Sequence, residues 1–483
     1  MQVKVTISIL FFLLCTMNMQ AQQQKKYYTG LLLDDSAYAL IPQKPELLTR
    51  GYDILPKSYS LRKYCPVVRN QGHYSTCTSW ATTYAARTIA EAVANHWQDS
   101  VQITKEAFSP LFTYALLKPP YDINCQEGIY LPPAFKALKD KGTVKYSDFD
   151  LNCSSVISNK LYSKAMSYTI DDYFALFPNG APSSQKINAS KKSIAENRPV
   201  VISMANYTSF SNDKEEVWSG ITDIKEGYHA LCAVAYDDNK YGGAFLLMNS
   251  WGTRWGDSGF KWVRYDDYGK HVNYAMEMYV RGKKGSPNPP SPLKPTPAPV
   301  PAKWKFMDLA GELRFVLSTG ITMRPKLHTV NNTPYYKLEG SYISGTRYRL
   351  YLSNHEPAYV YVIGSDLTNS VSKIFPPHNR ISPALVYKSN DIAIPDEQWY
   401  IEMDDTKGKD YICVLYSKEE LVIDDIIVKI KMESGSFFDK INKVLEDKIA
   451  PARTIKYSTS VINFSVKNTG KTLVPVIVEI EHQ

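Results

Sequence analysis

The sequence predicts an α+β protein made of two structured parts joined by a proline-rich spacer. Residues 53–284 mix helix-like and strand-like periodicity, and residues 305–483 alternate mainly in the strand-like way. Between them, residues 285–304 hold eight prolines in twenty positions. A tract of this composition cannot build a core and adopts an extended conformation. We therefore place the main domain boundary in this tract.

The N-terminus has the layout of a secretory signal peptide. Lys4 precedes an apolar run over residues 9–14, and small and polar residues follow as far as Ala21. We predict a signal peptide over residues 1–21 and a short N-terminal extension over residues 22–52. The apolar run is too short to span a bilayer, which takes about 20 residues. We expect export to a periplasmic, cell-surface or extracellular location, with no membrane span in the mature chain.

Composition limits the partners and the redox environment. The net charge of +8 is spread along the whole length, which is too mild and too even to predict a nucleic-acid partner. Seven cysteines are present, six of them after the predicted signal peptide. In an oxidising compartment this number favours disulfides, although the number of paired cysteines need not be even if one thiol has a chemical role.

Two helices are expected in the first part. Residues 75–97 carry an apolar stripe at four-residue steps, and Ser75 or Thr76 can cap the start of this helix. The stripe consists of Ala81, Ala85, Ile89, Val93 and Trp97. A second helix is expected over residues 132–142, because prolines stand near its first turn and Gly142 can end it.

The second part is predicted to be a β-sandwich with a helical insertion. Strand-like alternation covers residues 348–354, 358–366, 460–468 and 473–481, and a helical pattern covers residues 437–449. The sequence of this part holds no cluster of catalytic residue types. We expect a binding or spacer module, and both a cell-surface contact and substrate capture are open as its role.

Cys77 and Gln71 are the first candidates for chemistry. Cys77 lies in the first turn of the longer predicted helix, where free backbone N–H groups and the helix dipole favour a thiolate. The alternative is a small buried cysteine that only fills space. Gln71 lies six residues upstream, where its amide could donate to an oxyanion. The alternative for Gln71 is an ordinary polar loop residue.

His229 is the candidate general base. It follows a Gly-Tyr pair and opens the apolar run 230–235, which places it at the mouth of a buried strand, although a structural histidine fits the same position. The next predicted strand ends at Asn249, whose side-chain oxygen can accept a hydrogen bond from the imidazole and fix its tautomer. Trp251 can shield that hydrogen bond from water, and Gly252 lets the chain turn.

Three segments resemble the signature blocks of the papain-like cysteine peptidases: QGHYSTCTSWA, GYHALCAVAYD and LLMNSWGTRWGDSGF. The resemblance covers residues 53–284. It implies a papain-like fold of two lobes, one helical and one β-barrel-like, with a cleft between them. It also implies a Cys77–His229–Asn249 triad and an oxyanion site formed by Gln71 and the backbone N–H of the cysteine. The expected substrate is a protein or peptide, the expected state is a monomer, and no metal or cofactor is required.

A fourth segment, NCQEGIYLPPAFKALKDKG, is similar to the cleft wall of that family. By this resemblance, Gly128 pairs with the substrate backbone and Tyr130 borders a subsite. Trp251 completes the expected substrate-binding set.

The sequence also departs from the family pattern. Trp80 stands third after the nucleophile and not first, and Tyr74 replaces a half-cystine three residues before it. Since Cys125 thereby loses its usual partner, we expect it to pair with Cys153. The pairing of three cysteines is open: Cys65, Cys232 and Cys413. Residues 22–52 are too few for the long inhibitory propeptide of many relatives, so the way in which activity is restrained is also open.

The favoured interpretation is an exported cysteine endopeptidase that works through a thioester intermediate. One alternative is a transglutaminase-like acyl transferase, although such proteins generally use Asp where this chain has Asn249. The other alternative is a catalytically silent binding protein that keeps the scaffold. The second part resembles a bacterial domain of unknown function found attached to proteases.

Overall fold

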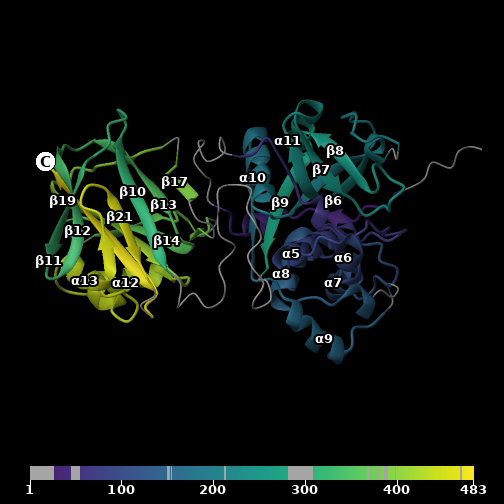
Figure 1. Cartoon of the computed structure of the whole chain (residues 1–483), viewed down its shortest axis with the longest axis horizontal. Coiled ribbons are helices and arrows are strands. Elements are labelled where there is room, and N and C mark those ends of the chain that lie inside the picture. The colour runs from purple at the N-terminus through teal and green to yellow at the C-terminus, as the bar shows by residue number, and fades with distance from the viewer. Residues whose placement is uncertain are drawn as a thin grey trace, which may run out of the picture.

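The computed structural model describes residues 27–44, 55–149, 153, 155–211, 214–280, 308–366, 370–378, 381–385, 390–396, 399–467 and 470–483. The predicted signal peptide and the proline-rich spacer lie outside these residues. The described residues form a mixed helical and β part up to residue 280 and a mainly β part from residue 308, which lie beside each other in Figure 1. None of the described helices is long and apolar enough to cross a bilayer.

The helix that begins at Cys77 is enclosed by the rest of the helical lobe. It consists of α4 (Cys77–Ser79), the π-helical stretch η2 (Trp80–Arg87) and α5 (Thr88–Ala94). Each of its residues as far as Val93 is buried, so the burial extends well beyond the one apolar stripe. Thr76 occupies the N-cap position, but neither predicted cap holds, because no side chain there makes a capping hydrogen bond.

The lobe also contains four shorter helices, of which α7 and α8 contact this one: α6 (Ser100–Lys105), α7 (Pro110–Leu117), α8 (Leu131–Asp140) and α9 (Asn159–Ala165). Helix α8 is the second predicted helix. Gly142 follows its end with a φ of +71°, and a Cβ at this position would lie 2.0 Å from the carbonyl oxygen of Ala165. Both the turn and the close packing therefore require glycine.

The β lobe is a seven-stranded sheet with the order β4-β9-β5-β6-β7-β8 and with β2 paired to β6. Its strands are β2 (Ser58–Ser60), β4 (Asp172–Ala175), β5 (Val200–Tyr207), β6 (Lys225–Asp237), β7 (Ala244–Met248), β8 (Phe260–Arg264) and β9 (Val272–Tyr279). The helices α10 (Ser183–Ala195) and α11 (Tyr265–His271) pack on it. The lobe expected to be β-barrel-like is thus an open sheet.

Strand β6 is buried without interruption from Ala230 to Tyr236. Such a run is typical of a strand that is covered on both faces, and here α10 and the helix of Cys77 both contact it. The helical and β lobes share one hydrophobic core, so the start of the Cys77 helix and the His229 strand are held at the same interface.

The second part is a sandwich of two sheets, as predicted. One sheet has the order β17-β13-β10-β21-β20, with β18 on β13, and the other has the order β11-β12-β22-β19-β14-β15, with β16 on β14. The first sheet contains β10 (Leu309–Leu317), β13 (Arg347–Asn354), β17 (Asn390–Ile394), β18 (Ile401–Glu402), β20 (Ile455–Tyr457) and β21 (Ile462–Val466). The second contains β11 (Pro325–Val330), β12 (Thr333–Tyr342), β14 (Ala358–Ser365), β15 (Val371–Phe375), β16 (Ala384–Leu385), β19 (Gly408–Ser417) and β22 (Leu473–His482).

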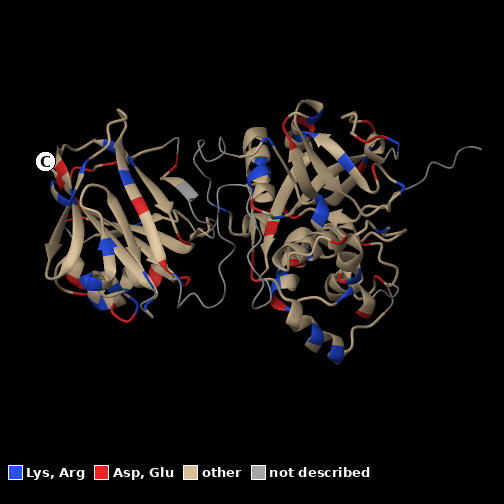
Figure 2. Cartoon of the chain, in the orientation of Figure 1, with Lys and Arg blue, Asp and Glu red and all other residues tan. Residues whose placement is uncertain are grey.

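Two helices cover the outer face of the second sheet. They are α12 (Ile423–Met432), which the sequence reasoning missed, and α13 (Phe437–Leu445), which lies in the predicted helical stretch. A second hydrophobic cluster joins these helices to the sheet, and this is why β22 is buried on both faces. Lysines and arginines are interspersed with aspartates and glutamates on both parts of the molecule (Figure 2).

Candidate active site

Cys77 lies at the start of α4, at the interface of the two lobes. Its side chain is fully buried, and the backbone N–H of Ala230 donates toward its sulfur. Burial raises the pKa of the thiol to about 12, and this effect exceeds the opposing contributions of the Ala230, Thr78 and Cys77 hydrogen bonds. The sequence predicted an easily ionised thiol from the helix N-terminus alone. In the structure, the burial of the thiol outweighs the effect of the helix N-terminus on its pKa.

His229 is fixed on β6 by the strand that follows it. Strands β6 and β7 are antiparallel, with Cys232 opposite Met248, so the residue after β7 comes back beside His229. The Nε2 atom of His229 lies 2.7 Å from Oδ1 of Asn249. Since an amide oxygen only accepts, Nε2 carries the proton, and in the neutral ring Nδ1 keeps its lone pair.

Trp251 covers this imidazole as predicted. The two rings stack with centroids 4.5 Å apart and an interplanar angle of 19°. The His229 side chain is fully buried, and its Nδ1 has no hydrogen-bond partner among the described residues. Burial lowers the pKa of His229 to about 4, against the opposing effect of the Asn249 hydrogen bond. The ring is therefore neutral near pH 7, with a bare acceptor nitrogen.

The turn after Asn249 depends on glycines and on a second indole. Trp255 packs edge-on against Trp251 with centroids 5.3 Å apart. Gly259 has a φ of +92°, and a Cβ there would lie 2.5 Å from the Cβ of Val68. The Gly259 carbonyl accepts the Asn249 N–H at 3.0 Å. The two indoles and Gly259 thus fix the turn that carries the amide of Asn249.

Gln71 lies at the same site, but its amide is already engaged. Its Oε1 accepts from the Ser250 hydroxyl at 2.6 Å. Its Nε2, the predicted oxyanion donor, donates to the carbonyls of Tyr74 at 2.7 Å and Tyr28 at 3.1 Å. Tyr28 belongs to the N-terminal extension, to which the sequence reasoning gave no structural role.

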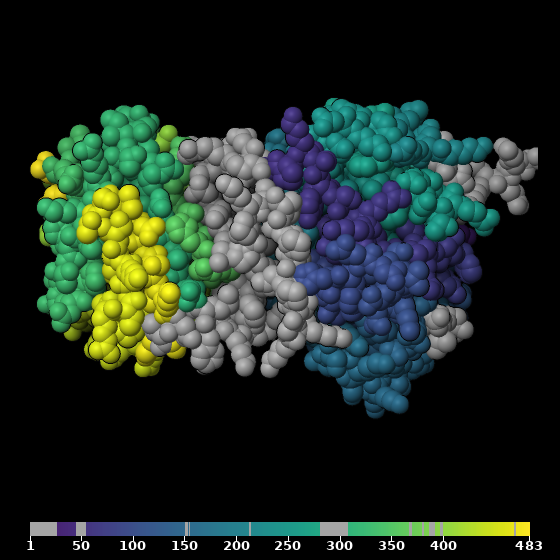
Figure 3. Space-filling model, in the orientation of Figure 1, coloured from purple at the N-terminus to yellow at the C-terminus, as the bar shows by residue number. Residues whose placement is uncertain are grey.

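Residues 27–44, which we call the strap, run across the predicted cleft. Tyr27 stacks on Trp251 with centroids 4.6 Å apart, and the Trp251 indole donates to the Tyr28 carbonyl at 2.9 Å. The space-filling view shows N-terminal residues, in purple, against both the blue helical lobe and the teal β lobe (Figure 3). The short pattern YYTGLLL (27–33) was the available signal, since an aromatic pair followed by glycine and leucines suits an extended buried segment.

The wall that contains Gly128 and Tyr130 pairs with this strap. Strand β1 (Leu31–Leu32) runs parallel to β3 (Ile129–Tyr130), and the Ile129 N–H donates to the Gly30 carbonyl at 3.1 Å. A Cβ on Gly128 would lie 2.2 Å from that carbonyl oxygen. The backbone at 128–130 therefore accommodates an extended chain, which in this structure is the protein's own.

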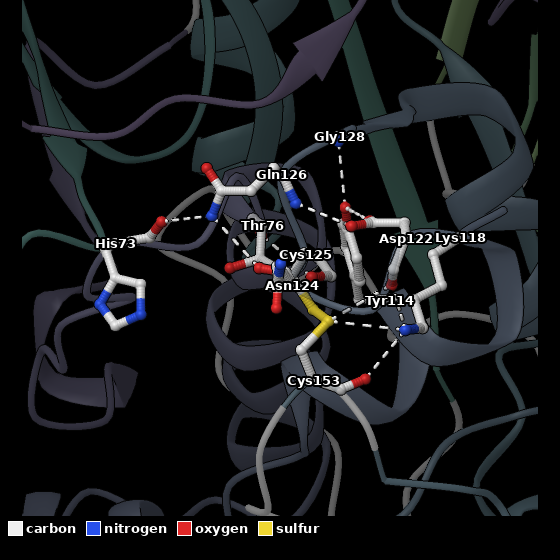
Figure 4. Close-up of a disulfide and its surroundings, with 11 residues drawn as sticks. His73, Thr76, Tyr114, Lys118, Asp122, Asn124, Cys125, Gln126, Gly128 and Cys153 are labelled. Carbon is white, nitrogen blue, oxygen red and sulfur yellow. Dashed lines mark hydrogen bonds between the residues drawn. A yellow bond between two sulfur atoms is a disulfide. The ribbon is translucent and has the colours of Figure 1, made fainter. Parts of the chain in front are cut away.

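The predicted disulfide between Cys125 and Cys153 is present, with Cα atoms 5.7 Å apart (Figure 4). Tyr74 packs against its cluster in place of the missing half-cystine. The loop before Cys77 is also joined to the Cys125 segment by hydrogen bonds, from Ser75 N–H to the Cys125 carbonyl at 2.7 Å and from Gln126 to the His73 carbonyl at 2.8 Å. The free cysteines of the described residues are all buried: Cys65, Cys77, Cys232 and Cys413.

Two segments of the chain match known protein families. Residues 55–281 match the sequence profile of the papain family cysteine proteases, and residues 341–420 match that of a domain of unknown function, DUF4384. The chain is 27% identical over 256 residues to the probable cysteine protease RD21B of Arabidopsis thaliana, which covers 50% of this chain and 51% of that protein. It is 26% identical over 217 residues to zingipain-2 of Zingiber officinale, which covers 43% of this chain and 87% of that protein.

Among solved structures, the chain is similar to xylellain, a cysteine protease from Xylella fastidiosa. The identity is 22% and the TM-score is 0.44, with coverage of 54% of this chain and 98% of that one. The chain spans about half the length of the first curated relative. The segment from residue 55 to residue 281 belongs to the papain family of cysteine proteases.

Proposed function

We propose that this chain is an exported cysteine endopeptidase with a Cys77–His229–Asn249 triad. One observation carries the proposal. The His229 imidazole is held by the Asn249 side-chain oxygen and the Trp251 indole, and its Nδ1 has no partner among the described residues. The next residue, Ala230, donates its N–H toward the Cys77 sulfur. A base and a nucleophile in this relation are what acyl transfer through a thioester requires.

In the proposed reaction, the site first admits water and a peptide. Cys77 then loses its proton to Nδ1 of His229, and the sulfur attacks the peptide carbonyl carbon. The imidazolium gives the proton to the departing amine as the C–N bond breaks, which leaves a thioester. His229, neutral again, takes a proton from water as the water oxygen attacks the thioester carbonyl carbon. The C–S bond then breaks, the imidazolium returns that proton to the sulfur, and the acid and the thiol are released.

The developing oxyanion needs donors in this scheme. We propose the backbone N–H of Cys77 and the Nε2 of Gln71, which donates to the Tyr28 carbonyl in the closed structure. The backbone of residues 128–130 is the proposed pairing site for an extended substrate, with Tyr130 and Trp251 at its borders. These groups already hold an extended chain there, since the Ile129 N–H and the Trp251 indole donate to strap carbonyls.

The triad is tested through its third member. Replacing Asn249 by alanine removes the acceptor on Nε2 and frees the imidazole to change tautomer, so kcat is expected to fall by about 100-fold with a smaller change in KM. Peptide hydrolysis is measured across pH 4–9, with Asn239→Ala, a substitution in the turn after β6, as the control. An unchanged kcat and pH profile in the Asn249 variant would remove Asn249 from the triad.

Peptide digestion also separates the proposal from its alternatives. A library of peptides is incubated with the chain, with and without a primary amine as acyl acceptor. Cleaved peptides with new carboxyl ends support the endopeptidase. Amide products formed with the added amine in place of cleavage would favour an acyl transferase. If neither the unaltered chain nor the Gly30→Ala variant described below reacts, a silent binding protein is favoured.

Export is the second element of the proposal. It is supported by the signal-like layout of residues 1–21 and by the Cys125–Cys153 disulfide, which is typical of oxidising compartments. Mass spectrometry of the secreted protein is expected to show a chain that begins at Gln22 and a linked pair of Cys125 and Cys153 peptides. Recovery of the chain with residues 1–21 still attached, or with both cysteines as thiols, contradicts this element.

A further inference from the structure

The strap closes the site that the proposed function requires. Cys77 and His229 both have an exposure of 0%, and Gln71 has 2%. Strap residues contact the groups around them, through the Tyr27 ring on Trp251, the Tyr28 carbonyl on Gln71 and the Gly30 carbonyl on the cleft wall. A peptide can reach the sulfur only after residues 27–32 have left.

The middle of the strap is anchored on the β lobe. Helix α2 (Asp35–Ala39) buries Tyr38 completely, and its ring stacks on Tyr274 with centroids 4.1 Å apart. The Tyr38 hydroxyl donates to the Phe177 carbonyl at 2.8 Å and accepts from the Ala275 N–H at 3.2 Å. This anchor holds the middle of the strap, between its cleft-bound residues and its end, against the β lobe.

The end of the strap joins both parts of the protein. On one side, the Ala175 N–H of β4 donates to the Pro42 carbonyl at 3.0 Å, and the Lys44 N–H donates to the Ala175 carbonyl at 3.0 Å. On the other side, the Ser382 N–H of the C-terminal part donates to the Gln43 carbonyl at 2.8 Å. Gln43, which lies between Pro42 and Lys44, is thus paired with strand β4 of the peptidase sheet on one side and with the C-terminal part on the other.

An apolar contact surrounds this junction. Phe174 and Tyr279 of the β lobe meet edge to face with centroids 5.2 Å apart, and Ala384 of the C-terminal part is buried in the same cluster with Tyr359 at its margin. Figure 1 shows the C-terminal part on the β9 side of the peptidase. The C-terminal part therefore rests where the strap ends.

We propose that the C-terminal domain is a latch on the strap: by holding Gln43, it keeps the cleft closed. The proposal rests on the function proposed above, because it concerns access to that site. Loss of the contact at residues 381–384 removes a hydrogen bond and apolar burial that favour the closed strap. Anything that displaces the C-terminal domain from the β4 edge then raises the fraction of molecules with an open cleft.

The first experiment opens the cleft directly. A Cβ on Gly30 would lie 2.1 Å from the Ser75 carbonyl oxygen, so Gly30→Ala is expected to expel the strap and speed alkylation of Cys77 by iodoacetamide about 100-fold. The control is Gly180→Ala, since Gly180 also has a positive φ but has no atom within 4 Å of the added Cβ. Alkylation is followed in the full chain by mass spectrometry, and the three other buried free cysteines report on general unfolding.

The second experiment tests the latch. Ser382→Pro removes the N–H that reaches Gln43, and Cys77 alkylation is expected to rise about five-fold, the effect of one lost hydrogen bond. Ser382→Ala keeps that N–H and loses only the hydroxyl that accepts from the Ala384 N–H at 3.1 Å, a bond that the proline variant loses as well, so the rate difference between the two variants reports the Gln43 hydrogen bond. Ala384→Glu, which places a charge in the apolar contact, is expected to give the same rise as the proline variant. In a chain that already carries Gly30→Ala, Ser382→Pro is expected to add nothing, because both act on one step.

Each outcome is decisive. Equal alkylation rates in the unaltered chain, Gly30→Ala and Ser382→Pro overturn the latch, as does a Ser382→Pro effect that persists in full beside Gly30→Ala. Faster alkylation without any peptide hydrolysis supports the latch and contradicts the proposed function. Full peptide hydrolysis by the unaltered chain, with no gain in either variant, supports the function and contradicts the latch.

Discussion

Peptide hydrolysis is expected to disappear when Cys77 is replaced by alanine, with kcat/KM reduced by at least about 10⁴-fold. The sulfur forms the thioester in the proposed reaction, and the methyl group of alanine cannot act as a nucleophile. The buried surroundings of Cys77 accept the small alanine side chain, so the fold is expected to persist. Hydrolysis is measured in the unaltered chain and in the chain opened by Gly30→Ala, so that the strap does not mask the effect.

The matched control is Cys413→Ala. Cys413 is also a free and fully buried cysteine, but it lies in β19 of the C-terminal domain. This variant is expected to keep its hydrolysis while it loses some stability. If the Cys77→Ala chain cleaved peptides at more than a few per cent of the rate of its parent, Cys77 would not be the nucleophile.

A second large effect is expected at Glu277, where alanine should lower the free energy of unfolding by about 3–5 kcal/mol. This carboxylate on β9 is fully buried, and it lies 3.2 Å from the Arg198 guanidinium and 3.3 Å from the Lys44 ammonium. It also accepts from the hydroxyls of Ser193 and Tyr279, both at 2.6 Å. Its removal leaves buried cations and hydroxyls without their common acceptor.

The Glu277 carboxylate is also expected to make the free energy of unfolding depend on pH. Burial alone raises the pKa of Glu277, but Lys44, Arg198 and the two hydroxyls outweigh it and hold the pKa at about 2. Because the folded pKa lies below the ordinary value of 4.5, the stabilisation is complete above about pH 4.5 and is lost as the pH falls toward 2. Urea unfolding is measured between pH 6 and pH 2.5.

The control is Glu277→Gln, which keeps the shape of the side chain but cannot ionise. Its free energy of unfolding is measured over the same pH range. Its stability is expected to start lower and to fall less over the same range. Parallel curves for the two proteins would mean that Glu277 does not set the acid dependence. Because Lys44 ends the strap, the variant is also expected to loosen the latch described above.

The positions of the candidate site residues were more predictable from the sequence than the occupancy of the cleft by residues 27–32. The segments around Cys77, His229 and Asn249 carry strong local patterns, and a hairpin between β6 and β7 is a short-range feature of the sequence. The position of Gln71 followed from the same local spacing. What the sequence could not supply was the occupancy of the cleft, because it depends on contacts between Tyr28 and Gln71 that are separated by more than forty residues.

Two other errors have the same physical origin. A lowered pKa for Cys77 was argued from the helix N-terminus, a local effect, and was reversed by burial at the interface of the two lobes, which is not local. The Cys77 helix was expected to show one apolar face, but polar residues such as Thr82 and Thr83 are also buried. Thr82 donates back to the Thr78 carbonyl at 2.8 Å, so its hydroxyl is satisfied within the helix and can be enclosed.

The burial of Cys77 also bears on how its sulfur survives before the proposed reaction begins. A thiol whose pKa is about 12 holds almost no thiolate near neutral pH, and thiolate is the form that peroxides and disulfides attack. Its full burial also keeps dissolved oxidants from touching it. Under the proposed export, the closed chain crosses an oxidising compartment, forms its Cys125–Cys153 bridge there, and keeps the sulfur of Cys77 neither oxidised nor mispaired.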